Sequence, residues 1–179
     1  MNSSCNKVLG SRKEYDQVCS QIRRDVDFDS MFNSIILLEI RDYDKVRERI
    51  GSLEYDAAVA RLSDMIEDHL DEEMIATLYG DGLYMIVIHD AKTPDDIASL
   101  AYAVMEDFEK EYSSDGISLI SACASCASDP VSLYRCAYDR SLAALAEARS
   151  NGSRLKFIGD MKDETMEEDE WQRSTRSQN

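Results

Sequence analysis

The hydrophobic pattern separates strand-like runs from segments with helical spacing. Residues 34–40 form a continuous apolar run, typical of a strand that is covered on both faces. Residues 74–79 and 83–88 are two further strand-like runs, separated by Gly80-Asp81-Gly82. An Asp-Gly pair between two such runs predicts a β-hairpin with a type I′ turn, in which both central residues have positive φ.

Apolar residues at three- and four-residue spacing predict helices over residues 11–33 and 55–70. Thr93-Pro94-Asp95-Asp96 predicts the start of a third helix, with threonine as the N-cap and proline at the first helical position. A fourth helix is expected to begin at Asp129-Pro130 and to end at a C-terminal cap formed by Asn151-Gly152.

Two more strands are expected at residues 117–127 and 155–158. The resulting order, α-β-α-β-β-α-β-α-β, predicts an α+β fold, in which a mixed central β-sheet with a β-hairpin is flanked by helices. The pattern stops after residue 159. We therefore expect one domain over residues 1–159 and an acidic, solvated tail over residues 160–179.

The composition excludes several classes of protein. Hydrophobic residues make up 44% of the 179 residues, enough for one packed core. Twenty Lys and Arg stand against 36 Asp and Glu, and the formal net charge of −16 repels nucleic acid and anionic lipid. No apolar run is long enough to span a membrane, and the first ten residues lack the apolar region of a signal peptide. We expect a cytoplasmic protein with neither nucleic acid nor membrane as a partner.

The cysteines do not predict a metal site. Cys123 and Cys126 have the CxxC spacing, but positions three apart on a strand point to opposite faces. His69 and His89 have no matching ligand partners nearby in the sequence. Five cysteines are an odd number in a chain without export features, so buried free thiols are favoured over zinc or redox chemistry.

An apolar strand that ends in an acidic residue is followed by an aromatic residue, a helix and then Tyr-Gly-x-x-x-aromatic on a hairpin. This order resembles the GGDEF domain of diguanylate cyclases over about residues 7–158. Residues 9–15 are similar to the family's opening Leu-x-Asn-Arg-x-x-aromatic motif, residues 36–43 to its first strand and Asp-x-Asp-x-Phe segment, and residues 148–152 to its closing Ala-Lys-x-x-Gly motif. The resemblance implies the nucleotidyl-cyclase-like palm fold and a role in bacterial cyclic di-GMP signalling.

The family's signature falls on five residues, most of which have changed: Gly80, Asp81, Gly82, Leu83 and Tyr84. In that family two metal ions, held by two carboxylates and a backbone carbonyl, act on the triphosphate of GTP. The resemblance places the first carboxylate at Glu39, the carbonyl at Ile40 and the second carboxylate at Gly82, which has no side chain. One carboxylate offers too few hard oxygen ligands, so Mg²⁺ is expected only if nucleotide binding is retained.

Other family positions have also changed. The resemblance places nucleotide-binding residues at Asp56, Arg47 and Arg149, of which only the aspartate matches the family. Leu78, Asp44 and Ser153 stand where the family has basic residues, and Asp71 and Met74 replace its product-binding Arg-x-x-Asp.

These departures favour a catalytically inactive GGDEF-like regulatory or interaction module, whose partner is another protein or a second copy of the chain. Such a module could retain binding of GTP or another guanine nucleotide. The alternative is an active but divergent diguanylate cyclase or nucleotide hydrolase that uses Glu39 and Asp81 for the metal. A third hypothesis is a scaffold that uses only its acidic surface. Because the chain starts at its first expected helix, signals should arrive through a partner, a ligand or expression level, unless it is a piece of a longer protein.

The same residues also have structural explanations. Glu39 could be an ordinary solvated acid at the end of a strand or a helix cap. Asp56 and Arg149 could serve only the dipoles of their helices. Asp81-Gly82 could be nothing more than a tight turn. A solvated charged face is expected for the neighbouring Arg41, Asp42, Asp44, Arg47, Glu48 and Arg49.

Overall fold

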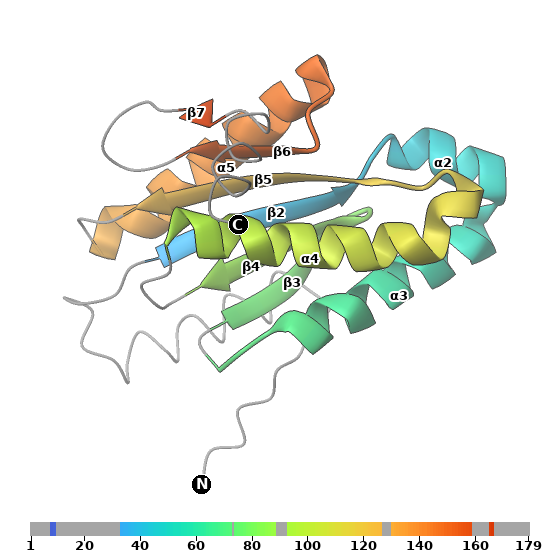
Figure 1. The fold of residues 1–179 in the computed structure, drawn as a ribbon, viewed down its shortest axis with the longest axis horizontal. Helices are drawn as coiled ribbons and strands as arrows, with labels where there is room; N and C mark the ends of the chain where they lie inside the picture. Colours follow the sequence, from blue (N-terminus) through green and yellow to red (C-terminus); the bar gives the residue numbers. More distant parts are fainter. Residues whose placement is uncertain are drawn as a thin grey trace, which may run out of the picture.

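The structure is a computed structural model, and it describes residues 8–9, 33–72, 74–88, 93–126, 130–158 and 165–166. They form a seven-stranded mixed sheet with the strand order β1-β3-β4-β2-β5-β6-β7 (Figure 1). The β1–β3 and β5–β6 pairs are parallel and the other pairs are antiparallel. In sheet order the strands are β1 (Val8–Leu9), β3 (Met74–Gly80), β4 (Leu83–Ile88), β2 (Asn33–Ile40), β5 (Leu119–Cys126), β6 (Leu155–Ile158) and β7 (Thr165–Met166).

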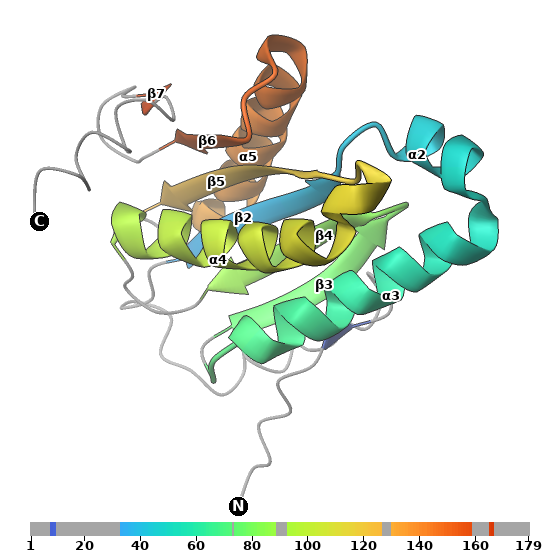
Figure 2. The same ribbon diagram turned by 45° about the vertical axis from the view of Figure 1, so that its right-hand side comes forward.

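Helices cover both faces of this sheet. α3 (Ser52–His69) and α4 (Pro94–Tyr112) lie on one face, and α5 (Pro130–Asn151) lies on the other (Figure 2). α2 (Tyr43–Ile50) follows the end of β2, and a 3₁₀ turn (Ser113–Asp115) follows α4. The expected fold class, a mixed sheet with a hairpin flanked by helices, is confirmed.

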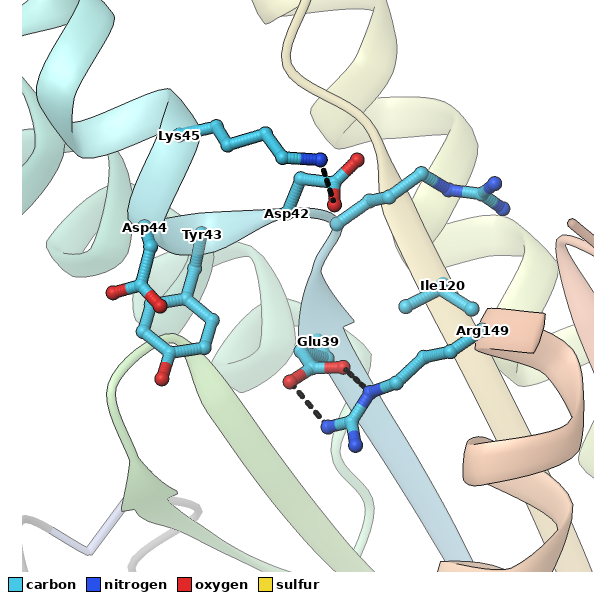
Figure 3. A pocket seen from close by; sticks show the side chains of 8 residues that line it. Glu39, Asp42, Tyr43, Asp44, Lys45, Ile120 and Arg149 are labelled. Carbon is cyan, nitrogen blue, oxygen red and sulfur yellow. Dashed lines mark hydrogen bonds and ion pairs between the residues drawn. The ribbon is translucent and has the colours of Figure 1, made fainter.

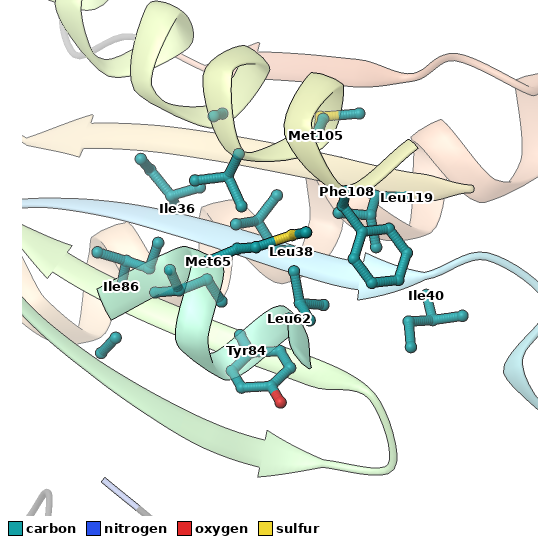
Figure 4. Packing of buried hydrophobic residues seen from close by; sticks show 14 of the residues in the cluster. Ile36, Leu38, Ile40, Leu62, Met65, Tyr84, Ile86, Met105, Phe108 and Leu119 are labelled. Carbon is teal, nitrogen blue, oxygen red and sulfur yellow. The ribbon is translucent and has the colours of Figure 1, made fainter. Parts of the chain in front are cut away.

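β2 is the central strand, and its residues alternate between two hydrophobic cores. Ile36, Leu38 and Ile40 pack in the core beneath α3 and α4 (Figure 4), whereas Ile35 and Leu37 pack in the core beneath α5. All five are fully buried. The prediction from the continuous apolar run is therefore confirmed: β2 is covered on both faces, and a strand with helices on both faces needs apolar residues at nearly every position.

The β3–β4 hairpin forms as expected, but its turn is not of type I′. Gly82 has φ of 74°, whereas the only non-glycine residue with positive φ among those described is Asp42. Asp81 therefore lacks the positive φ that a type I′ turn requires. The register shifts between Leu78 and Gly80, so an irregularity in β3 takes up one residue just before the turn.

The helix ends follow the expected capping in two places. Thr93 Oγ1 accepts a hydrogen bond from the Asp96 N–H, and the Asp96 carboxylate accepts one from the Thr93 N–H, which makes a capping box. α5 ends at Asn151, and Gly152 follows with φ of 78°.

Other parts of the structure differ from the expectations or fall outside the described residues. α2 was not predicted, and α3 begins at Ser52, so Asp56 lies in its second turn rather than at its start. Residues 11–32 of the expected helix over 11–33 lie outside the described residues, and Asn33 belongs to β2 instead. Within the expected solvated tail, Thr165–Met166 pairs with β6 as β7, while the domain boundary at residue 159 stays a prediction.

Candidate functional site

A cavity of about 430 Å³ lies where β2 ends, between α2 and the last turn of α5 (Figure 3). Strand β2 positions Glu39 there, and the turn after it positions Arg41 and Asp42. The cavity is lined by Glu39, Arg41, Asp42, Tyr43, Asp44, Lys45, Ile120 and Arg149.

Glu39 and Arg149 form a bidentate ion pair in this cavity. Arg149 Nε donates to Glu39 Oε2 at 2.7 Å and Nη2 donates to Oε1 at 2.5 Å, so that the guanidinium holds both carboxylate oxygens. The Glu39 side chain is 7% exposed and that of Arg149 is 51% exposed. The hydrogen bond to Glu39 raises the pKa of the Arg149 guanidinium above its usual range. Of the alternatives for Glu39, an ordinary solvated acid at the end of a strand is excluded, because the residue is buried and paired.

The charges that line the cavity cancel. Lys45 Nζ lies 3.1 Å from Asp42 Oδ1, and both side chains are exposed. Arg41 Nη2 donates to the Ser153 carbonyl at 2.9 Å, beyond the end of α5. With Glu39, Asp42 and Asp44 opposite Arg41, Lys45 and Arg149, the lining holds three formal negative and three formal positive charges.

Two of the arginines expected on a solvated face instead join distant segments. Arg41 bonds to the end of α5, as described above. Arg49 Nη2 donates to the carbonyl of Asp115 at 2.7 Å and to that of Gly116 at 3.2 Å, which ties α2 to the turn before β5. Backbone carbonyls, which carry no residue-specific signal in the sequence, are the acceptors in both cases.

Tyr55 of α3 occupies the space beside the hairpin turn. A Cβ atom built on Gly82 would collide with the Tyr55 hydroxyl. Tyr55 is 3% exposed, and its hydroxyl has no hydrogen-bond partner among the residues that the structure describes. Burial, together with nearby Asp81, raises the pKa of Tyr55 to about 12. The role of Tyr55 has no signal in the sequence, because a tyrosine at a helical core position does not indicate contact with a hairpin 27 positions away.

The remaining predicted site residues lie outside the cavity. The Arg47 guanidinium lies 5.9 Å from the centre of the Tyr55 ring. Asp56 and Asp81 are exposed, and Ile40 is fully buried, where its N–H donates to the Gly82 carbonyl at 3.0 Å. The structure therefore brings Glu39 and Arg149 together, but it does not bring Arg47, Asp56 or Asp81 into the lining of the same cavity.

The described residues do not fit a divalent metal ion. Among them, no group of three or more His, Cys, Asp or Glu side chains is placed to hold one. Both Glu39 oxygens bind Arg149, and position 82 offers no side-chain oxygen, whereas Mg²⁺ requires an octahedral set of oxygen ligands. Cys123 does not suggest a metal either, because it is fully buried and burial raises the pKa of its thiol to about 12. The Cys126 side chain and His89 lie outside the described residues.

The sequence matches no protein-family model and no curated protein. Solved structures do match. The GGDEF domain of DgcB from Caulobacter crescentus, in complex with c-di-GMP, superposes with a TM-score of 0.67 at 16% identity, over 89% of this chain and 96% of that one. Diguanylate cyclase SiaD from Pseudomonas aeruginosa, in complex with its activator SiaC, has a TM-score of 0.65 at 12% identity, over 84% and 58% of the two chains.

Vibrio cholerae LapD, as an S helix-GGDEF-EAL protein bound to c-di-GMP, has a TM-score of 0.62 at 16% identity, over 97% of this chain and 41% of that one. At such low identities the likeness concerns the fold. The chain has the fold of the GGDEF domains of diguanylate cyclases.

Proposed function

We propose that this chain is a GGDEF-like module without cyclase activity, which acts through protein contacts in cyclic di-GMP signalling. The bidentate pairing of Glu39 with Arg149 carries this proposal. Phosphoryl transfer by a two-metal site needs free carboxylate oxygens for the metal ions and free cations for the phosphates. Here one residue of each kind neutralises the other.

The hairpin supports the same conclusion. The resemblance assigns the second metal-binding carboxylate to position 82, where this chain has glycine at positive φ and where the Tyr55 hydroxyl takes the adjacent space. Asp81, the alternative ligand, lies exposed at the turn. The metal set of Glu39 and Asp81 would require Glu39 to leave Arg149.

The electrostatics of the cavity also disfavour a triphosphate. Its formal charge is zero, and the whole chain carries −16. A nucleotide with several negative charges would therefore approach without the attraction that phosphate sites ordinarily provide. Retained binding of a guanine nucleotide is the alternative to this proposal, and it would require Arg149 to exchange Glu39 for a phosphate.

A partner protein or a second copy of the chain is the proposed target of the module. SiaD, one of the similar structures, forms a complex with its activator SiaC, so a protein that contains this fold can act with a protein partner. None of the described helices is long and apolar enough to cross a membrane. We place the module in the cytoplasm, where cyclic di-GMP signalling operates. The oligomeric state can be measured by analytical ultracentrifugation over a concentration series.

Product formation tests the proposal directly. The purified chain is incubated with GTP and either Mg²⁺ or Mn²⁺, and cyclic di-GMP and GDP are measured by mass spectrometry beside an active diguanylate cyclase. We expect neither product above the level of a protein-free control. Cyclic di-GMP that disappears in Glu39→Ala but persists in Lys110→Met, an exposed cation outside the cavity, would establish the active alternative instead.

Thermal melting with GTP, GDP, ATP and cyclic di-GMP, each with and without Mg²⁺, tests retained binding. A ligand at about 100 times its Kd stabilises a protein by about 2.7 kcal/mol. We expect no shift with any nucleotide. A shift of several degrees with a guanine nucleotide alone, lost in Arg149→Met and kept in Lys110→Met, would show that the module still senses nucleotide.

A further inference from the structure

Tyr55 of α3 carries a buried hydroxyl group beside the hairpin turn. Its side chain extends from α3 toward the β3–β4 turn, and its hydroxyl has no hydrogen-bond partner among the described residues. Buried hydroxyl groups are usually hydrogen-bonded, because losing water without a replacement bond is unfavourable. An unbonded hydroxyl at this place therefore needs another explanation.

The hydroxyl occupies the space beside Gly82. The atom nearest to a Cβ at this position is the Tyr55 hydroxyl oxygen, which lies so close that the buried tyrosine or the hairpin turn would have to shift, and Ile40 side-chain carbons follow at 3.4 Å. The other glycine of the turn differs, since a Cβ on Gly80 would meet no atom within 4 Å. The collision is therefore specific to the position that the resemblance assigns to the second metal ligand.

We infer that Tyr55 closes the second metal position: its hydroxyl fills the volume that any side chain at residue 82 would need. The inference deepens the proposed function and rests on it for the meaning of position 82. Tyr55 and a side chain at residue 82 exclude each other. Replacing Gly82 with a carboxylate is then insufficient to rebuild a metal ligand, because the tyrosine must be shortened as well.

The test is a double-mutant cycle with Gly82→Ala and Tyr55→Phe, read by urea unfolding without nucleotide or metal. In the parent background, Gly82→Ala should raise the unfolding equilibrium constant through both positive φ and the collision. In the Tyr55→Phe background only the φ strain remains. We expect the effect of Gly82→Ala to be about tenfold or more smaller there, as for a relieved overpacking contact.

Two matched controls accompany the cycle. Gly80→Ala should have the same effect in both backgrounds, because its Cβ faces open space. Tyr55→Phe alone should cost no stability, whereas Tyr84→Phe should cost stability, since the Tyr84 hydroxyl donates to the Val59 carbonyl at 2.6 Å.

The inference is overturned if Gly82→Ala changes the unfolding equilibrium constant by the same factor, within about twofold, in both backgrounds, because independent sites show that behaviour. If Gly82→Ala does not fold in the parent background, a folded double variant carries the same conclusion, and a double variant that also fails to fold overturns it. The cycle does not depend on activity. Cyclic di-GMP production by the parent chain would refute the proposed function, whereas an additive cycle without product would refute only the role of Tyr55.

Discussion

Removal of the Arg149 guanidinium tests most directly how much the Glu39–Arg149 ion pair contributes to stability. Arg149→Met keeps most of the aliphatic length of the side chain and deletes both hydrogen bonds to Glu39. The Glu39 carboxylate then stays at the end of β2 with only 7% of its side chain exposed and without its partner. Since the pair joins β2 to α5, the loss should appear in global unfolding.

The magnitude follows from the burial of the two partners. Breaking a fully buried ion pair costs about 3–5 kcal/mol, because one charge stays buried and unpaired. Arg149 is half-exposed, so water reaches the carboxylate once the guanidinium is gone, and we expect a loss of about 2–3 kcal/mol in the free energy of unfolding. For a chain of this size that corresponds to a fall in Tm of roughly 4–12 °C.

Urea unfolding with linear extrapolation measures the change, and Lys45→Met is the matched control. Lys45 lines the same cavity and pairs with Asp42, but the two side chains are 79% and 59% exposed. Exposed pairs contribute little, so this control should change stability by about 0.5 kcal/mol or less. The double variant Glu39→Met/Arg149→Met should recover to within about 1 kcal/mol of the parent, because an apolar pair needs no compensation.

Equal losses in Arg149→Met and Lys45→Met would refute the reasoning, since burial would then not determine the cost. A double variant as unstable as Arg149→Met alone would refute it in a different way. The loss would then come from the packing of the Arg149 stem rather than from the unpaired carboxylate.

Further predictions concern a helix cap, a buried tyrosine and a buried thiol. Thr93→Ala should lower the free energy of unfolding by about 1 kcal/mol by removing the acceptor for the Asp96 N–H, while Thr93→Ser should keep it, as measured by urea unfolding; equal losses would contradict this role. Burial raises the pKa of Tyr84 to about 12 from an ordinary 10, so its stabilising contribution is complete below pH 10 and falls between pH 10 and 12. Stability of the parent should therefore decline more steeply over that range than stability of Tyr84→Phe, by up to about 1.4 kcal/mol per pH unit, and parallel curves would refute the assignment. Cys123 should resist alkylation by iodoacetamide at pH 8 until urea unfolds the chain, because its thiol is fully buried and its pKa is raised to about 12; peptide mass spectrometry that found native labelling would show that the strand opens.

Local signals in the sequence were sufficient for most of the fold. The apolar run of β2, the two runs around Gly80-Asp81-Gly82 and the cap at Thr93 each depend on neighbours within a few positions, and the structure has each element near its expected bounds. α2 was missed because only Val46 of its eight residues is buried, so its charged pattern resembled a solvated face. The turn was assigned the wrong type because the irregularity between Leu78 and Gly80 depends on pairing with β4, which the Asp-Gly pair does not reveal.

The candidate site was less predictable because its contacts are long-range. The resemblance indicated Glu39 and Arg149 separately, but the bond between them joins residues 110 positions apart and changes the role of both. Tyr55 lies directly before Asp56 in the sequence, and only the folded hairpin shows that its hydroxyl reaches Gly82. A family motif can thus indicate positions, whereas occupancy of the space between them has to come from the structure.

The place of β2 in the sheet has a consequence for how the chain folds. β2 pairs with β4 on one side and with β5 on the other, and both partners come much later in the sequence. Its contacts therefore close long loops, which slows folding relative to chains dominated by local contacts. During synthesis, a nascent chain that has passed residue 88 can complete the β3-β4-β2 sheet while the other edge of β2 waits for residues 119–126. Its apolar side chains that later pack beneath α5 are then uncovered, and such exposed apolar surface promotes aggregation of the nascent chain.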